Sequence, residues 1–263
     1  MANKQFWDIV EEFNSLMKSA IEGPDCTKLC KGDCCSIKID VPKVLAEEYI
    51  HKGHAKKDDF TRSDVFSFKL RFDETTGRCF LFDKSINGCL VHHTNKKPPQ
   101  CFIYPTNFSH PEQEEVSCKR LGGWKIIDPA KAKKAECLLK YYIFLCKLEA
   151  RKEIRNLKRR LSTSLENNTL SKLLQNTAPS SIAGVKDTWD NISLLSSEGF
   201  SLQLKNLCAQ HKPKCGVNFI ECEAICPEVT QGILEYLQGK LYRYIRKHDP
   251  DTEGEYPFLK LFK

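Results

Sequence analysis

The stretch Cys26-Thr-Lys-Leu-Cys30-Lys-Gly-Asp-Cys34-Cys35 gathers four cysteines into ten residues. Thiolates three or four residues apart can converge on a soft metal ion, because the intervening residues let the chain curl around one centre. Neighbouring side chains point apart in extended backbone, so the adjacent Cys34 and Cys35 favour two centres or a cluster over a single ion. The alternative is that one of this pair is a buried thiol with no ligand role. On the first interpretation, bound metal staples a region that has little apolar core of its own.

The whole chain has 263 residues, with 14 cysteines and a formal net charge of +7. Its 41% hydrophobic and 29% charged residues exclude wholesale disorder, and its length predicts one or two domains. The longest apolar stretch, residues 138–148, is too short to cross a bilayer, and residues 1–20 have the pattern of an amphipathic helix and not of a signal peptide. We therefore expect a cytoplasmic protein without a membrane contact. In that reducing compartment cysteines more often bind metal than form disulfides.

Hydrophobic periodicity predicts helices over residues 1–20, from about 40 to 50 with Asp40 as N-cap, over 129–165, and over 228–246. Short alternating patterns typical of strands cover residues 36–39 and 64–91. We predict an α+β fold: a cysteine-rich, metal-stapled module with short strands, a long helix and a C-terminal helical extension. Residues 166–197, rich in Ser, Thr and Asn, indicate a linker between a domain at 1–165 and a C-terminal unit at 198–263.

The long helix is apolar on both sides in its first half, since Cys137, Tyr141, Phe144 and Leu148 lie opposite the main stripe. We expect that half to be buried all round and the basic second half, residues 151–160, to be exposed. Cys137 and Cys146 are nine residues apart, which is about 900° of rotation at roughly 3.6 residues per turn. They point to opposite faces, cannot share a metal ion, and are predicted to be core thiols.

Three further blocks follow the four-cysteine stretch: Gly77-Arg-Cys79-Phe-Leu81-Phe-Asp83, then Gly88-Cys89-Leu-Val91, then Lys97-Pro98-Pro-Gln-Cys101-Phe-Ile-Tyr104-Pro105. Together, over residues 26–105, the four blocks resemble the cysteine-cluster family that carries the zinc- or iron-chelating CxxCxxCC domain. The resemblance implies metal binding by seven thiolates: Cys26, Cys30, Cys34, Cys35, Cys79, Cys89 and Cys101. The first block departs from the family pattern in its spacing, three and three residues instead of two and two. Lys97 and Phe102 stand where the family has arginine, but no departure removes a thiol.

Two closed sites of four thiolates would need an eighth ligand, and Cys118 is the next cysteine along the chain. Thiolates at these positions are compatible with an iron–sulfur cluster or with zinc. The Cys-Cys pair suits a multinuclear centre, and members of the family that the chain resembles are often described as iron–sulfur proteins. We therefore expect an iron–sulfur cluster, with zinc as the alternative cofactor. One of the adjacent His92 and His93 is a further candidate to replace a thiol.

A second group, outside the resemblance, has the spacing Cys208-x2-His211-x3-Cys215-x6-Cys222-x3-Cys226-Pro227. Four thiols and an imidazole that end directly before a helix can form a separate tetrahedral site, with the proline at the first helical position. The alternative is that they are buried or free thiols. We include Cys208, Cys215, Cys222 and Cys226 among the predicted metal ligands.

The predicted function is metal binding, with a structural or redox role for the thiolate-bound centre. Two alternatives stay open: a cluster-dependent modifying enzyme such as a protein lysine methylase, whose flagellin-modifying examples carry a similar cysteine cluster, and a zinc-stapled interaction protein. Metal ions are the expected partners, and the C-terminal unit offers a surface for a protein partner. Nucleic acid is not expected, because Glu149 and Glu153 can pair with the basic helix face. Two filled sites would also lower the +7 charge to about +3.

Overall fold

A computed structural model describes residues 2–23, 28, 31–36, 38–63, 66–70, 72–73, 75–102, 125–166, 168–196, 202–248, 250 and 254–258. The chain forms two compact units, the first from Met1–Phe60 and Val65–Ala150, the second from Thr61–Asp64 and Arg151–Lys263. Helices combine with short antiparallel strands in small sheets, which confirms the α+β class. None of the helices in the described ranges is both long and apolar enough to span a membrane.

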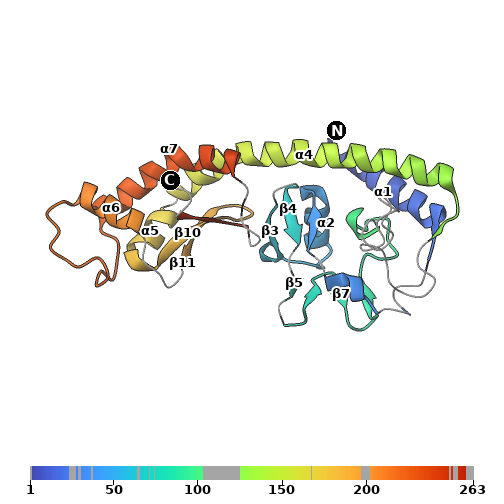
Figure 1. Ribbon diagram of the computed structural model, residues 1–263, viewed down its shortest axis with the longest axis horizontal. Helices are drawn as coiled ribbons and strands as arrows, with labels where there is room; N and C mark the ends of the chain where they lie inside the picture. The colour runs from blue at the N-terminus through green and yellow to red at the C-terminus, as the bar shows by residue number, and fades with distance from the viewer. Residues whose placement is uncertain are drawn as a thin grey trace. The chain divides into compact units, whose positions relative to one another are not determined.

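In the first unit, helix α1 (Ala2–Ala20) runs beside the first part of helix α4 (Pro129–Glu166) (Figure 1). The two helices pack through their apolar faces, and the Phe6 ring meets the Tyr142 ring edge-on with centroids 6.0 Å apart. The predicted N-terminal helix is confirmed. The predicted N-cap at Asp40 is wrong: helix α2 (Lys43–His51) begins after Pro42, because residues 39–41 are drawn into strand pairing instead.

The strands of the first unit are two or three residues long, and four of their pairs are antiparallel. They are β1 (Ile21–Glu22) with β9 (Lys125–Ile126), β2 (Ile39–Val41) with β4 (Phe68–Leu70), β5 (Phe72–Asp73) with β6 (Arg78–Cys79), and β7 (Phe82–Asp83) with β8 (Gly88–Cys89). Strand β3 (Phe60–Arg62), whose last two residues belong to the second unit, follows the 3₁₀ turn η2 (Lys57–Asp59). A second such turn, η1 (Asp33–Ser36), precedes β2. The predicted β-rich region is confirmed, and its two small hairpins carry Cys79 and Cys89.

Helix α4 has the predicted limits but not the predicted burial. Its first half is buried on one face only, since Tyr141, Phe144 and Leu148 are 41%, 54% and 43% exposed. The main stripe at steps of three and four faces the core, and the described elements leave the opposite face uncovered. The second half is not wholly exposed either, because Glu153 and Arg160 are buried.

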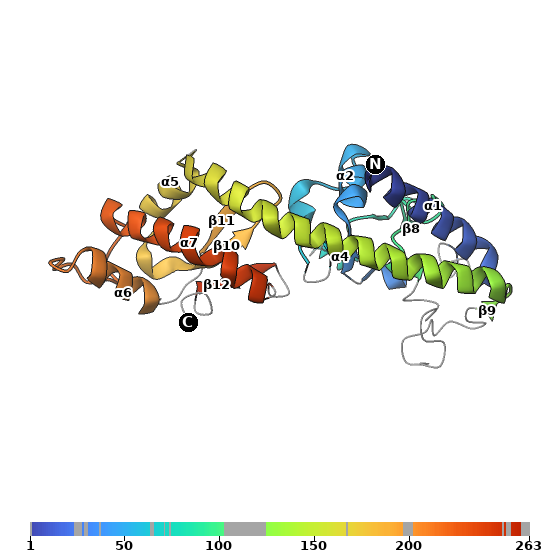
Figure 2. The same ribbon diagram turned by 90° about the horizontal axis from the view of Figure 1, so that it is seen from above.

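The second unit contains a three-stranded sheet in the order β11–β10–β12 with helices packed on it (Figure 2). Its elements are α5 (Thr169–Gln175), the turn η4 (Pro179–Ser181), β10 (Ile182–Asp187), β11 (Ile192–Ser196), α6 (Leu202–His211), α7 (Pro227–Lys247) and β12 (Glu255–Pro257). The predicted C-terminal helix is confirmed by α7. All five residues of its predicted apolar face are buried: Val229, Ile233, Leu237, Leu241 and Ile245.

The predicted linker at 166–197 needs correction. Residues 169–196 form α5, β10 and β11, and Leu170, Leu174 and Val185 are fully buried in the core of the second unit. The apolar residues of this segment are few and widely spaced among Ser, Thr and Asn, so composition masked a short helix and two short strands. The division between the two units also falls at Ala150 and Arg151, inside α4, and not at residue 165.

Candidate metal centres

The four-cysteine stretch is described in its second half. Cys26 and Cys30 lie outside the described residues, as does Cys118, and of Cys34 only the backbone in η1 is described. Lys31 and Gly32 have φ angles of 47° and 73°, and the Cys35 amide donates to the Gly32 carbonyl at 2.8 Å. The chain therefore turns sharply directly before the Cys-Cys pair.

This turn contacts the β5–β6 hairpin through Arg78 and the β7–β8 hairpin through Phe82. The Arg78 guanidinium donates to the Gly32 carbonyl at 2.5 Å and stacks over the Phe82 ring, 5.2 Å from its centroid. A Cβ atom on Gly32 would lie 2.6 Å from the Phe82 ring and 3.4 Å from Cys35 Sγ. Only glycine fits here, because of both the positive φ and the close approach of Phe82.

Three cysteines contribute to the raised pKa of one buried phenol. Tyr49 of α2 is fully buried and donates to the Lys96 carbonyl at 2.7 Å. Burial raises the pKa of Tyr49 well above its ordinary value, and Cys101, Cys89 and Cys79 make smaller contributions in the same direction. Three cysteines from β6, β8 and the turn after Pro98 thus act on the ionisation of a single side chain.

Burial also controls the ionisation of Cys79 in this group. It raises the pKa of the Cys79 thiol to about 12, with a smaller contribution from the Cys89 charge. The Cys79 thiol is therefore protonated at neutral pH. Within the described ranges, no three His, Cys, Asp or Glu side chains are arranged to hold a metal ion. The described thiols of the first unit therefore do not form a ligating group.

The second group sits between α6 and α7. Cys208 lies in α6, Cys226 is the N-cap of α7 with Pro227 at the first helical position as predicted, and the connecting loop carries Cys215 and Cys222. Burial raises the pKa of Cys208 to about 11, and the charges of Cys226, Cys222 and Cys215 add to that shift. The four thiols are therefore neighbours. They too fall short of ligating geometry.

His211, the fifth member of this group, packs on α7. A Cβ atom on Gly232 would overlap the His211 ring, so this side chain lies against the helix backbone. Lys212, the next residue, lies 3.5 Å from the Glu228 carboxylate, and the charge of Cys226 is the first cause of its raised pKa.

The two cysteines of α4 differ in their surroundings. Cys146 is fully buried, as predicted for a core thiol, whereas Cys137 is exposed, which corrects the prediction for that residue. Burial raises the pKa of Cys146 well above its ordinary value, with a smaller effect from the Glu149 charge. Neither residue belongs to one of the two predicted sets of metal-binding cysteines.

The sequence did not indicate a buried ion network in the second unit. Arg160 donates to both oxygens of Asp187, at 3.1 and 2.8 Å, and Arg62 Nε lies 3.1 Å from Asp187 Oδ2. Glu153 Oε2 lies 3.5 Å from Arg160 and 3.8 Å from Arg62, and all four side chains are at most 10% exposed. The signal in the sequence was weak: Glu153 and Arg160 share the helical face of the apolar Leu157 and Leu161.

Comparison of the chain with protein-family models, with curated proteins and with solved structures gives no match. The resemblance over residues 26–105 therefore stays a prediction.

Proposed function

We propose that the protein binds metal through two sets of thiolates. The first set holds an iron–sulfur cluster, with zinc as the alternative, and consists of Cys35, Cys79, Cys89 and Cys101 together with cysteines outside the described residues. The second set, Cys208, Cys215, Cys222 and Cys226, holds zinc. Two observations carry the proposal: Cys79, Cys89 and Cys101, from three separate segments, each contribute to the raised pKa of the buried Tyr49, and the turn at Gly32 before Cys35 accepts a hydrogen bond from Arg78, the neighbour of Cys79.

The short strands of the first unit support the proposed metal centre. Its strands are two or three residues long, and such short pairs are only marginally stable without further support. A centre that joins η1, β6, β8 and the turn at Cys101 would cross-link these segments. Thiolates suit both iron–sulfur clusters and zinc, and ligation would displace the proton that Cys79 carries at neutral pH. An iron–sulfur cluster, when bound, supplies one-electron redox chemistry.

The second unit offers a more compact donor set. All four of its thiols belong to one helix end and the loop that follows, and this loop contributes only Phe219 and Ile225 to the core. Lys212 places a positive charge near Cys226 and Cys215. Four thiolates around one ion is the arrangement of structural zinc sites.

Metal content tests both sites. We expect the full chain, purified without oxygen, to contain iron and acid-labile sulfide with broad visible absorbance, together with one zinc ion. Cys89→Ser should remove the iron and spare the zinc, Cys222→Ser should do the reverse, and Cys137→Ser on the exposed face of α4 is the matched control. A colourless protein that contains two zinc ions would show that the first set holds zinc and not an iron–sulfur cluster. Unchanged metal content in both ligand variants would refute the proposal.

A further inference from the structure

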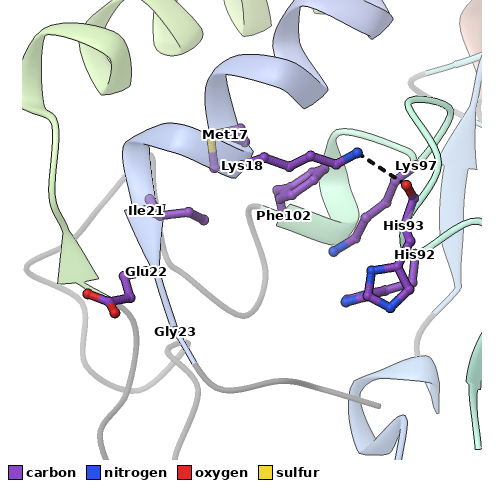
Figure 3. Close-up of a pocket in the computed structure, with 9 residues that line it drawn as sticks. All are labelled: Met17, Lys18, Ile21, Glu22, Gly23, His92, His93, Lys97 and Phe102. Atoms are coloured by element: carbon purple, nitrogen blue, oxygen red, sulfur yellow. Dashed lines mark hydrogen bonds between the residues drawn. The ribbon is translucent and has the colours of Figure 1, made fainter. Parts of the chain in front are cut away.

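A pocket of about 480 Å³ opens in the first unit between the end of α1 and residues 92–102 (Figure 3). One wall is apolar and consists of Met17, Ile21 and Phe102. The rest of the lining includes two lysines and two histidines. Pockets of this size enclose small organic ligands, and such sites combine apolar walls with a few polar groups that fix orientation.

Lys97 is the residue of the lining that most strongly indicates a bound ligand. Its side chain is 5% exposed and reaches past Phe102 into the pocket, with the ammonium 4.0 Å from the centroid of that ring (Figure 3). Its backbone is fixed to α1, because the buried Asn14 amide donates to the Lys97 carbonyl at 3.1 Å. No carboxylate in the described part of the chain pairs with the ammonium. A charge on a nearly buried side chain without a counterion is costly, and the contact with the face of Phe102 offsets only part of that cost.

The other charges around the pocket are also mostly positive. Lys18 donates to the His93 carbonyl at 3.2 Å and to Asn95 Oδ1 at 2.9 Å, and both acceptors are neutral. The rings of His92 and His93 meet edge-on, with centroids 4.7 Å apart. Glu22 is the one acidic residue in the described lining, and Figure 3 shows its carboxylate directed away from both lysines. The pocket therefore has a net positive charge on one side and an apolar wall on the other.

We propose that this pocket binds a small organic oxyanion. Its phosphate or carboxylate group lies at the Lys97 ammonium, within reach of Lys18, and its apolar part lies against Met17, Ile21 and Phe102. Lysine binds such groups as a compact point charge with three donors. None of the described residues that line this pocket is a cysteine, although Phe102 directly follows the proposed ligand Cys101.

Phenyl phosphate is the first probe, because it joins an oxyanion to an apolar ring. We expect saturable binding to the full chain by isothermal titration calorimetry at low salt, with one site. Lys97→Met keeps the length and apolar packing of the stem on Phe102 and removes the charge, so it should weaken binding about tenfold or more. Lys97→Arg restores a positive charge and should bind within about threefold of the natural protein. Lys133→Met, an exposed lysine on α4 outside the pocket, is the matched control and should change affinity by less than about twofold.

The two parts of the ligand are tested separately. Inorganic phosphate and benzyl alcohol should each bind more weakly than phenyl phosphate, because each lacks one of the two complementary groups. Phenylacetate tests the carboxylate arm, and the tighter of the two ring-bearing anions identifies the preferred oxyanion. Absence of binding by both, or binding that Lys97→Met leaves unchanged while its thermal unfolding matches the natural protein, would overturn the proposal. Equal affinity for inorganic phosphate and phenyl phosphate would overturn the role of the apolar wall.

Discussion

Replacing Asp187 by alanine should markedly lower the free energy of unfolding of the second unit. Asp187 accepts two hydrogen bonds from Arg160 and lies 3.1 Å from Arg62 Nε, with 6% of its side chain exposed. Its loss leaves two buried guanidinium groups with one carboxylate, that of Glu153, at 3.5 and 3.8 Å. Removing one partner from a buried ion pair typically costs about 3–5 kcal/mol, because an uncompensated charge stays behind. We expect Asp187→Ala to lower the free energy of unfolding of the second unit by that amount.

Hydrogen exchange read by mass spectrometry resolves the two units. Amides of β10, the central strand of its sheet, report on the second unit, and amides of β4 serve as the internal reference in the first. Glu136→Ala is the matched control, since its pair with Lys140 is exposed and should contribute at most about 0.5 kcal/mol. In a double-mutant cycle, Arg160→Met should couple to Asp187→Ala by about 1–3 kcal/mol. A loss below about 1 kcal/mol for Asp187→Ala, equal to that of the control, would refute the role of the network.

Three further outcomes follow from the fold. Gly184→Ala should destabilise the second unit by about 1–3 kcal/mol in a denaturant titration, because the new Cβ would lie 2.5 Å from the Tyr256 carbonyl of β12. Gly239→Ala in α7 is the matched control: its Cβ would point into open space, so it should stabilise the unit by about 0.5–1 kcal/mol in the same titration. Iodoacetamide at pH 8 should label the exposed Cys137 at least about tenfold faster than Cys146, as read from peptide masses; equal rates would contradict the burial of Cys146. Since burial raises the pKa of Cys146 in the folded state, the unfolded chain loses this proton first, and stability should fall as pH rises above about 8.5, with a shallower slope in Cys146→Ala.

Periodic apolar patterns predicted the long elements well. The limits of α1, α4 and α7 follow from residues spaced three and four apart, and every predicted core position of α7 is buried. The same patterns could not show that the far side of α4 is left uncovered at Phe144, because that depends on which elements pack there. Strands β10 and β11 escaped prediction, since five or six residues diluted by Ser and Lys give little periodic signal.

The candidate sites were predicted to different degrees. Spacing alone grouped Cys208 with Cys226, and these thiols are neighbours in the structure. Lys97 could not be recognised as a pocket residue, because its burial depends on α1, which lies far away in the sequence. Arg160 has the same composition around it as the exposed Arg159, and only the fold distinguishes them by bringing Asp187 within 2.8 Å. A charged side chain is buried by contacts with residues far away in the sequence, and the local sequence pattern gives no information about those residues.

The origin of Arg62 limits how the chain can be divided. Residues 61–64 belong to the second unit although the rest of that unit begins at Arg151. A fragment cut at the boundary in α4 would keep Glu153, Asp187 and Arg160 but lose Arg62, so two buried negative charges would face one positive charge. The same fragment would lose the guanidinium that donates to the Thr188 and Trp189 carbonyls after β10. The second unit therefore cannot be cut out as residues 151–263 without disturbing this network. During synthesis Arg62 is made before its partners Glu153 and Asp187, so its charge is balanced only after residues 151–187 have been added.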